Sequence, residues 1–213
     1  MSQMNQNFSG GKNKFWKDAE NEELLKDIIR SFNGTPIHPL PPKVPFIGIG
    51  VYAIYYVGKS HLYSEVSLAN RLSYDQPIYV GKAVSVPWIQ EENYSNSKGL
   101  ELFGRLKEHV ASINAARSTL KLEDFFVRYV VFEDNYSEMI AQIEEKMIEQ
   151  YKPVWNSCIE GFGNKGSEIK GCQWALTEWD VVHPGRPRGG KPLGNLEDRL
   201  SLERRIIKYL QKQ

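Results

Sequence analysis

One carboxylate of this sequence stands where an apolar side chain is expected. Segment 137–151 has helical periodicity, and its apolar residues form one face: Met139, Ile140, Ile143, Met147, Ile148 and Tyr151. Glu144 falls within that face, whereas Glu145 and Glu149 point to the opposite side. A carboxylate in an apolar setting is costly unless a cation compensates it. Glu144 is therefore a candidate metal ligand, with a buried ion pair or a solvent-reaching edge glutamate as the alternatives.

Two further polar residues share one side of a second predicted helix, 98–116. Arg105 and His109 are four residues apart, so their side chains lie on the same face, at one shoulder of the apolar stripe. A guanidinium offers a fixed fork of donors and an imidazole titrates near neutrality, which together suit a phosphate group. The alternative is a solvated helix flank.

A pair of tyrosines lies in two predicted strands. Segments 48–58 and 77–84 are rich in β-branched and aromatic residues and contain Tyr52 and Tyr79. If these strands pair, alternation lets the two phenols project together, and Lys82 follows closely. The alternative is that both tyrosines belong to the core.

The elements around these residues predict an α+β fold. A strand is expected over 124–132 and a last amphipathic helix over 196–211, so the body has the order β, β, α, β, α. We therefore expect a small antiparallel sheet of three strands flanked by helices. The sequence divides into an N-terminal arm (1–45), a core (46–157) with an insertion at 59–76, and a C-terminal extension (158–213).

The arm itself consists of a predicted helix and a linker. Apolar residues recur at helical spacing over 21–32, and 35–45 holds five prolines, which indicates an extended tether. The apolar face of that helix can pack on a partner chain or fold back on its own body, and both alternatives remain open.

The composition of the sequence excludes several classes of protein. The 213 residues carry a net charge of +1, so a uniformly basic nucleic-acid coat is excluded, although a local basic patch is not. The two cysteines, Cys158 and Cys172, have neither a CxxC spacing nor a nearby His pair, which argues against structural zinc and a disulfide scaffold. The polar start and the lack of a long apolar run favour a soluble, cytoplasmic protein without membrane contact.

Taken together, the motifs resemble a known family. Gly50-Val51-Tyr52, Tyr79-Val80-Gly81-Lys82 and the stretch EEKMIEQYKPVWN (144–156) are similar to the GIY-YIG nuclease superfamily over roughly residues 48–157. Val replaces Ile in both name-giving motifs, and the separation of Tyr52 from Tyr79 is longer than usual. With the insertion 59–76, the proline-rich arm and the basic C-terminal loop 183–195, this layout resembles the type II restriction endonucleases that cut the palindrome CCGCGG, in a bacterial cytoplasm.

The resemblance implies hydrolysis of a phosphodiester bond with one Mg²⁺, for which Mn²⁺ can substitute. Glu144 is expected to hold the metal, Arg105 to bind the scissile phosphate, and Tyr52 to act as general base. The reference pKa of tyrosine, about 10, is unfavourable for a base, so nearby cations are expected to lower it. His109 is expected to accept a proton from Tyr52 or to orient it.

Tyr79 and Asn156 complete the expected catalytic set, as supporting or phosphate-contacting residues. Which of Tyr52, Tyr79 and His109 is the base stays open at this stage. Other nuclease signatures, such as a PD…(D/E)xK run, do not occur in the sequence.

Two segments are candidates for DNA recognition. Loop 183–195 contains no acidic residue and three cations, Arg186, Arg188 and Lys191. Arginine paired with guanine is the commonest specific base contact. The alternative is that this Gly/Pro-rich loop is a surface turn with solvated charges. The insertion 59–76 contributes Arg71, and Lys82 is expected to contact DNA near the active site.

Three functions remain compatible with the residues. The first is a sequence-specific endonuclease, expected to act as a homodimer on double-stranded DNA and to be accompanied by a cognate DNA methyltransferase. The second is a repair or recombination nuclease that recognises DNA shape. The third is a non-catalytic DNA-binding protein on the same fold.

Overall fold

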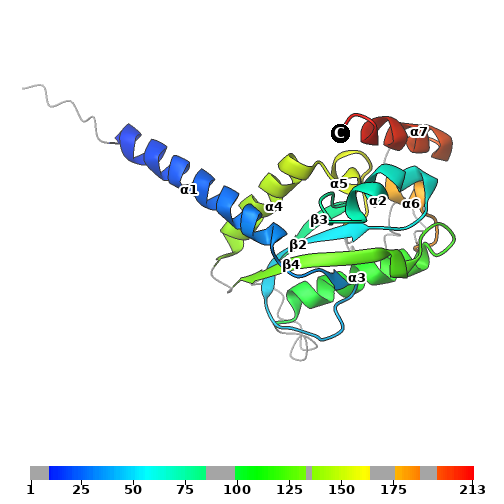
Figure 1. Cartoon of the computed structure of the whole chain (residues 1–213), viewed down its shortest axis with the longest axis horizontal. Coiled ribbons are helices and arrows are strands. Elements are labelled where there is room, and N and C mark those ends of the chain that lie inside the picture. The colour runs from blue at the N-terminus through cyan, green and yellow to red at the C-terminus, as the bar shows by residue number, and fades with distance from the viewer. Residues whose placement is uncertain (1–9, 85–98, 133–135, 164–175, 188–195) are drawn as a thin grey trace, which may run out of the picture.

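The computed structural model describes residues 10–84, 99–132, 136–163, 176–187 and 196–213, with side chains from residue 22 onward. Its centre is an antiparallel sheet of four strands in the order β1-β4-β2-β3 (Figure 1). The bounds of the strands are β1 His38–Pro39, β2 Ile49–Tyr56, β3 Tyr79–Ala83 and β4 Phe125–Phe132.

The expected α+β fold with an antiparallel sheet is confirmed, with one strand more than predicted. The additional strand β1 comes from the proline-rich segment, where His38 pairs with Val127 and Pro39 with Phe126. A proline is tolerated there because β1 is an edge strand, which has no second neighbour for its backbone to bond. The central strand β2 is paired on both sides, and Tyr52 lies opposite Gly81 of β3 and Tyr129 of β4.

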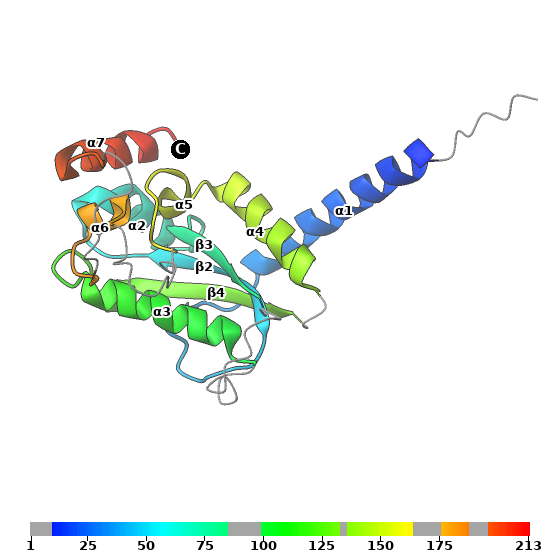
Figure 2. The ribbon, with the colours of Figure 1, turned by 180° about the vertical axis from the view of Figure 1, so that it is seen from behind.

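The helices lie on the two faces of the sheet (Figures 1 and 2). The long helices are α1 Gly10–Asn33, α3 Glu101–Ala115, α4 Ser137–Tyr151 and α7 Arg199–Leu210. Each of them covers all or most of one segment that the sequence predicted to be helical. The other described helices are short and lie in the connections between these elements and the strands: η1 His61–Tyr63, α2 Ser64–Asn70, η3 Leu122–Asp124, α5 Val154–Ser157 and α6 Glu178–Val182. None of the described helices is long and apolar enough to cross a membrane.

Strand alternation divides the core into two clusters, as the sequence pattern predicted. Tyr52, Ile54 and Tyr56 face one cluster, which includes side chains of α3, α5, α6 and α7. Val51 and Tyr55 face the other, which is completed by α1 and α4. Because every residue of β2 is buried, the strand is covered on both faces.

The N-terminal helix folds back on its own chain. Leu25, Ile29 and Phe32 of α1 are buried in the same cluster as Ile140, Ile143 and Met147 of α4. Of the two alternatives for this apolar face, the structure thus shows the intramolecular one. The N-terminal part of α1 extends beyond the body in Figure 1.

The insertion and the C-terminal helix also belong to this packing. Tyr63 and Val66 from 59–76, and Leu202 and Ile206 of α7, are buried in the cluster that contains Tyr52. Asn70 closes the turn after α2, because its side-chain amide donates to the carbonyls of Tyr56 and Gln76. The segment is therefore part of the folded body.

Candidate active site

The centre of the site is a buried tyrosine–histidine pair. Tyr52 comes from the middle of β2 and His109 from the inward face of α3, and both side chains are buried. The Oη of Tyr52 lies 2.6 Å from Nε2 of His109. At this distance a proton can pass between phenol and imidazole, which is the arrangement that general acid–base chemistry requires.

Aromatic rings surround the imidazole of His109. The ring of Tyr79, on β3, lies 5.1 Å from that of His109 and 6.2 Å from that of Tyr52. Phe162 stacks on His109 at 4.6 Å with an interplanar angle of 19°. The pairing of β2 with β3 brings the two tyrosines together, as the strand pattern predicted.

Arg105 lies one helical turn before His109 and its side chain is only 15% exposed. Its Nη1 donates to the carboxylate of Glu108 at 2.7 Å, and its Nη2 donates to the carbonyl oxygen of Gly163. Its charge and hydrogen bonding act to lower the pKa of both Tyr52 and Tyr79. The guanidinium is therefore close to both phenols, where a phosphate group could replace Glu108 as its acceptor.

Glu144 of α4 pairs with the ammonium group of Lys82 on the edge strand β3. The distance between Nζ and Oε2 is 2.5 Å, and the glutamate side chain is 18% exposed. Glu145 and Glu149 are exposed, so the predicted helical phase is confirmed. The carboxylate thus has the ion-pair partner that was one of the alternatives, and it binds a cation at a partly open position.

Burial raises the pKa of Tyr52 well above its ordinary value, and the neighbouring Tyr79 adds to the shift. Arg105 offsets this only in part. The pKa of Tyr79 is raised as well, chiefly by burial. Arg105 therefore acts on the pKa of Tyr52 in the expected direction, but desolvation of the phenolate outweighs the attraction of the guanidinium, so that the pKa is raised overall.

Asn156 has a structural position next to the site. Its Oδ1 accepts from the amide of Val80 at 2.8 Å, and its Nδ2 donates to the carbonyl of Val80 at 2.9 Å. The amide thus replaces a neighbouring strand along the outer edge of β3. Since both polar atoms are engaged, Asn156 holds Tyr79 and Lys82 in register rather than facing the phosphate.

The residues expected to bind DNA differ in their exposure to solvent. The structure places Arg186 in a buried ion pair with Asp180, with 7% of the arginine side chain exposed, and this placement contradicts the expectation that it reads bases. A guanidinium held in this way cannot reach a groove. Arg71 is exposed at the end of α2. Arg188 and Lys191 lie outside the described residues.

Two residues of structural importance were not found from the sequence. His183 was interpreted as a loop residue, but it is buried, with Nε2 2.6 Å from Oη of Tyr63 and Nδ1 2.9 Å from Oγ1 of Thr119. For Phe162 the sequence predicted no structural or functional role. Its position between Gly161 and Gly163 was the available signal, since flanking glycines allow a backbone to approach closely packed side chains.

The metal-binding potential of the site rests on Glu144. Among the described residues, no group of three or more His, Cys, Asp or Glu side chains could hold a metal ion. A single carboxylate is nevertheless suitable for Mg²⁺, which keeps several waters and binds phosphate oxygens. Glu144 already binds a cationic group, so the chemistry of the donor fits a one-metal site.

The sheet, the Tyr52–His109 pair, Arg105 and Glu144 together define a nuclease of the GIY-YIG superfamily. The family model described as the Eco29kI GIY-YIG domain matches residues 44–210, which is most of the chain, and the chain belongs to this family. It is thus a type II site-specific deoxyribonuclease with DNA as its substrate. No curated protein matches the sequence significantly.

Proposed function

We propose that this endonuclease hydrolyses both strands of a GC-rich palindrome in double-stranded DNA, with one Mg²⁺ per active site. The observation that carries the proposal is the buried hydrogen bond between Tyr52 and His109 beside Arg105 and Glu144. A proton-transfer pair next to a phosphate-binding cation and a metal-binding carboxylate has the parts needed for phosphodiester hydrolysis.

The tyrosine can act as a base only if its own proton has an acceptor, because its pKa is raised. In the proposed reaction Tyr52 takes a proton from the attacking water while its phenolic proton passes to Nε2 of His109. The 2.6 Å separation makes this transfer direct. This assigns the base to the Tyr52–His109 pair and leaves Tyr79 to shape the pocket.

Arg105 exchanges Glu108 for the scissile phosphate when DNA binds, and its charge then stabilises the additional negative charge of the transition state. Glu144 would hold the metal, and Lys82, its ion-pair partner in the structure, would then contact the DNA backbone. A bound Mg²⁺, or Mn²⁺ in its place, supplies charge stabilisation at the departing 3′ oxygen.

The proposed target is CCGCGG, which rests on the resemblance of the layout to enzymes that cut this sequence. With Arg186 buried, the remaining candidates for base or backbone contacts are Arg188, Lys191 and Arg71, together with Lys82 beside the active site. A cognate DNA methyltransferase is the expected functional partner, because an unprotected host genome would be cut.

A palindrome with two cleavable strands is matched by a two-fold symmetric protein. We therefore propose a homodimer, at least on DNA. Its interface does not use Leu25, Ile29 and Phe32, because these side chains are buried against α4 of the same chain. Light scattering of the full chain, with and without a palindromic duplex, tests this. One chain per duplex that cuts both strands at the normal rate would exclude the dimer.

Plasmid digestion with Mg²⁺ tests the function. We expect discrete fragments from the wild type and a loss of cleavage of roughly 10³-fold for Glu144→Gln, with DNA affinity retained. Glu145→Gln is the matched control, since this neighbouring carboxylate is exposed. Cutting confined to branched or damaged DNA would instead indicate a repair nuclease. Binding without cutting in Mg²⁺ or Mn²⁺ would indicate a non-catalytic protein.

A further inference from the structure

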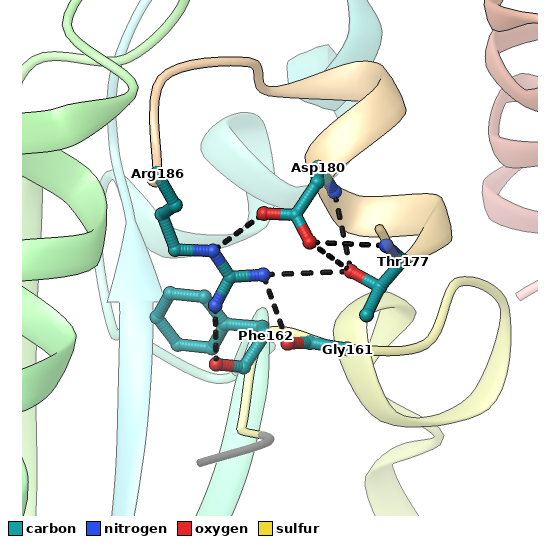
Figure 3. Close-up of polar contacts among 5 residues, drawn as sticks. All are labelled: Gly161, Phe162, Thr177, Asp180 and Arg186. Atoms are coloured by element: carbon teal, nitrogen blue, oxygen red, sulfur yellow. Dashed lines mark hydrogen bonds and ion pairs between the residues drawn. The ribbon is translucent and has the colours of Figure 1, made fainter. Parts of the chain in front are cut away.

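A dense polar network lies between the C-terminal part of the chain and the active site (Figure 3). Nε of Arg186 donates to Oδ1 of Asp180 at 2.6 Å, and Nη2 and Nη1 donate to the carbonyls of Gly161 at 3.0 Å and Phe162 at 3.3 Å. The guanidinium group of Arg186 thus links α6 to the backbone of residues 161–162.

The partners of this arginine are themselves held rigidly. Oδ2 of Asp180 accepts from the amide and the hydroxyl of Thr177, and the amide of Asp180 donates to Oγ1 of Thr177, which completes the capping box of α6. The guanidinium lies 4.4 Å from the ring centroid of Trp179. The ion pair is almost completely buried, with 7% and 2% of the two side chains exposed. Buried charges require this degree of pairing, so the arginine has one well-defined position.

The backbone segment attached to Arg186 fits its surroundings closely. Gly161 has a φ of +109°, a conformation that favours glycine, and a Cβ there would collide with the side chain of Thr177. A Cβ on Gly163 would collide with Oη of Tyr79. Segment 161–163 therefore has little freedom to shift between the network and the active site.

The same three residues contact the proposed catalytic side chains. Phe162 stacks on His109 at 4.6 Å and meets Tyr79 edge-on at 4.9 Å. The carbonyl of Gly163 accepts a hydrogen bond from Nη2 of Arg105. Displacement of this segment would move the imidazole, the second tyrosine and the phosphate-binding guanidinium together.

We propose that Arg186 is a positioning residue of the active site, which acts through segment 161–163 by pressing Phe162 against His109 and presenting the Gly163 carbonyl to Arg105. The proposal rests on the proposed function, because it assigns His109 and Arg105 to the reaction. It also gives the arginine of the basic loop a role other than base recognition.

The variant that isolates this role is Arg186→Lys. A lysine keeps the charge opposite Asp180 but cannot bridge the carbonyls of Gly161 and Phe162 with a planar fork. We expect kcat to fall roughly 10- to 100-fold, as a small misplacement of reacting groups does. KM for cognate DNA should stay within about threefold, because the effect is on orientation rather than on binding.

A second readout does not depend on activity. The chain holds four histidines, so NMR signals of the ring protons of His109 can be assigned with a His109→Gln variant. In the wild type these signals carry the ring-current shift of Phe162. In Arg186→Lys they should move toward their positions in Phe162→Leu, whereas a purely local effect at α6 would leave them unchanged.

Arg199→Gln is the matched control, because Arg199 also forms an ion pair, with Glu203, but is half exposed on α7. We expect it to retain wild-type kcat and wild-type His109 signals. If Arg186→Lys does not fold, Phe162→Leu decides, since the proposal predicts the same selective loss of kcat there.

The proposal is overturned if folded Arg186→Lys keeps the wild-type kcat and His109 signals, if its loss is entirely in KM, or if Phe162→Leu keeps the wild-type kcat. Failure of the proposed function has a different signature. A wild-type enzyme that does not cut DNA would refute the function, while the NMR comparison of Arg186→Lys with Phe162→Leu still tests whether Arg186 positions His109.

Discussion

In the part of the chain that the structure describes, two buried tyrosine–histidine pairs have the same O···N distance but different surroundings. Tyr52 and His109 are 2.6 Å apart, and so are Tyr63 and His183. The first pair lies next to Arg105, and Glu144 is close enough to influence its tyrosine. The further hydrogen-bond partners of the second pair are neutral, since Trp155 donates to Tyr63 and Thr119 contacts His183.

The difference teaches that the hydrogen bond alone does not make a catalytic site. In the second pair, burial lowers the pKa of His183 to about 3, so that the imidazole stays neutral, and burial raises the pKa of Tyr63. Arg199 and Arg186 are close enough to lower the pKa of His183 further, so the charges near this pair oppose protonation of the imidazole. The first pair has a guanidinium and a partly open carboxylate beside it, to which the proposed function assigns the phosphate and the metal.

The largest effect expected from this comparison is that of Tyr52→Phe on cleavage. Loss of the phenolic oxygen removes the group that exchanges protons with water and His109, so the rate should fall about 10²- to 10⁴-fold. Single-turnover cleavage of a cognate duplex measures this, with circular dichroism to verify the fold. A variant that cuts at the wild-type rate would remove Tyr52 from the mechanism.

Tyr63→Phe should show the opposite pattern. It leaves Nε1 of Trp155 and Nε2 of His183 without their partner, which should lower the free energy of unfolding by about 1–3 kcal/mol. Cleavage at a temperature where the protein remains folded should stay within about twofold of wild type. Urea titration and the same cleavage assay separate the two effects. A selective loss of cleavage would place this pair in the catalytic machinery.

The protonation of His183 should make the free energy of unfolding depend on pH, which tests how the second pair differs from the first. Its pKa of about 3 in the folded state lies below the ordinary value of 6.5, so the unfolded chain binds the proton more readily. The resulting stabilisation is complete above the unfolded pKa and is lost as the pH falls from that value toward 3. Between about pH 7 and pH 5 one such group should cost about 2 kcal/mol.

Urea unfolding of the wild type and of His183→Gln at several pH values in this range measures that contribution. The variant should be less stable at neutral pH and should show a shallower dependence on pH. Parallel curves for the two proteins would mean that His183 is not the neutral, buried group that the structure describes.

The smallest expected effect concerns Arg71, at the opposite end of α2 from Tyr63. Arg71 is exposed at the end of α2, and if DNA extends over this region, Arg71→Ala should weaken binding a few-fold on all sequences. The slope of log affinity against log salt should decrease by about 1. Binding titrations at several salt concentrations test this, with Arg30→Ala of α1 as the control. An unchanged slope would exclude DNA contact at α2.

Much of the candidate site could be predicted from local patterns. Strand alternation placed Tyr52 and Tyr79 on one face, and helical periodicity separated Glu144 from the exposed Glu145 and paired Arg105 with His109. Such patterns succeed because each depends on the geometry of one element, which repeats every two or about 3.6 residues. The family motifs follow the same elements, and the family match extends this to most of the chain.

The roles of residues in loops could not be read in this way. Arg186 and His183 lie close together in a Gly/Pro-rich segment that looked solvated, yet both are buried, one against Asp180 and one against Tyr63. Their partners are up to 120 residues away in the chain. No periodicity encodes such contacts, because they depend on how loops from different elements pack against one another.

By itself, the amino-acid sequence determined the secondary structure of the core, the face on which each motif residue lies, and the family to which the chain belongs, since these follow from short-range periodicity and motif spacing. Only the tertiary structure decided which tyrosine–histidine pair lies close to Arg105 and Glu144, that the N-terminal helix packs on its own chain, and in which direction the pKa of Tyr52 is shifted. The physical reason is that desolvation and electrostatic interactions depend on everything that surrounds a group in space, and those surroundings are assembled from residues far apart in the chain.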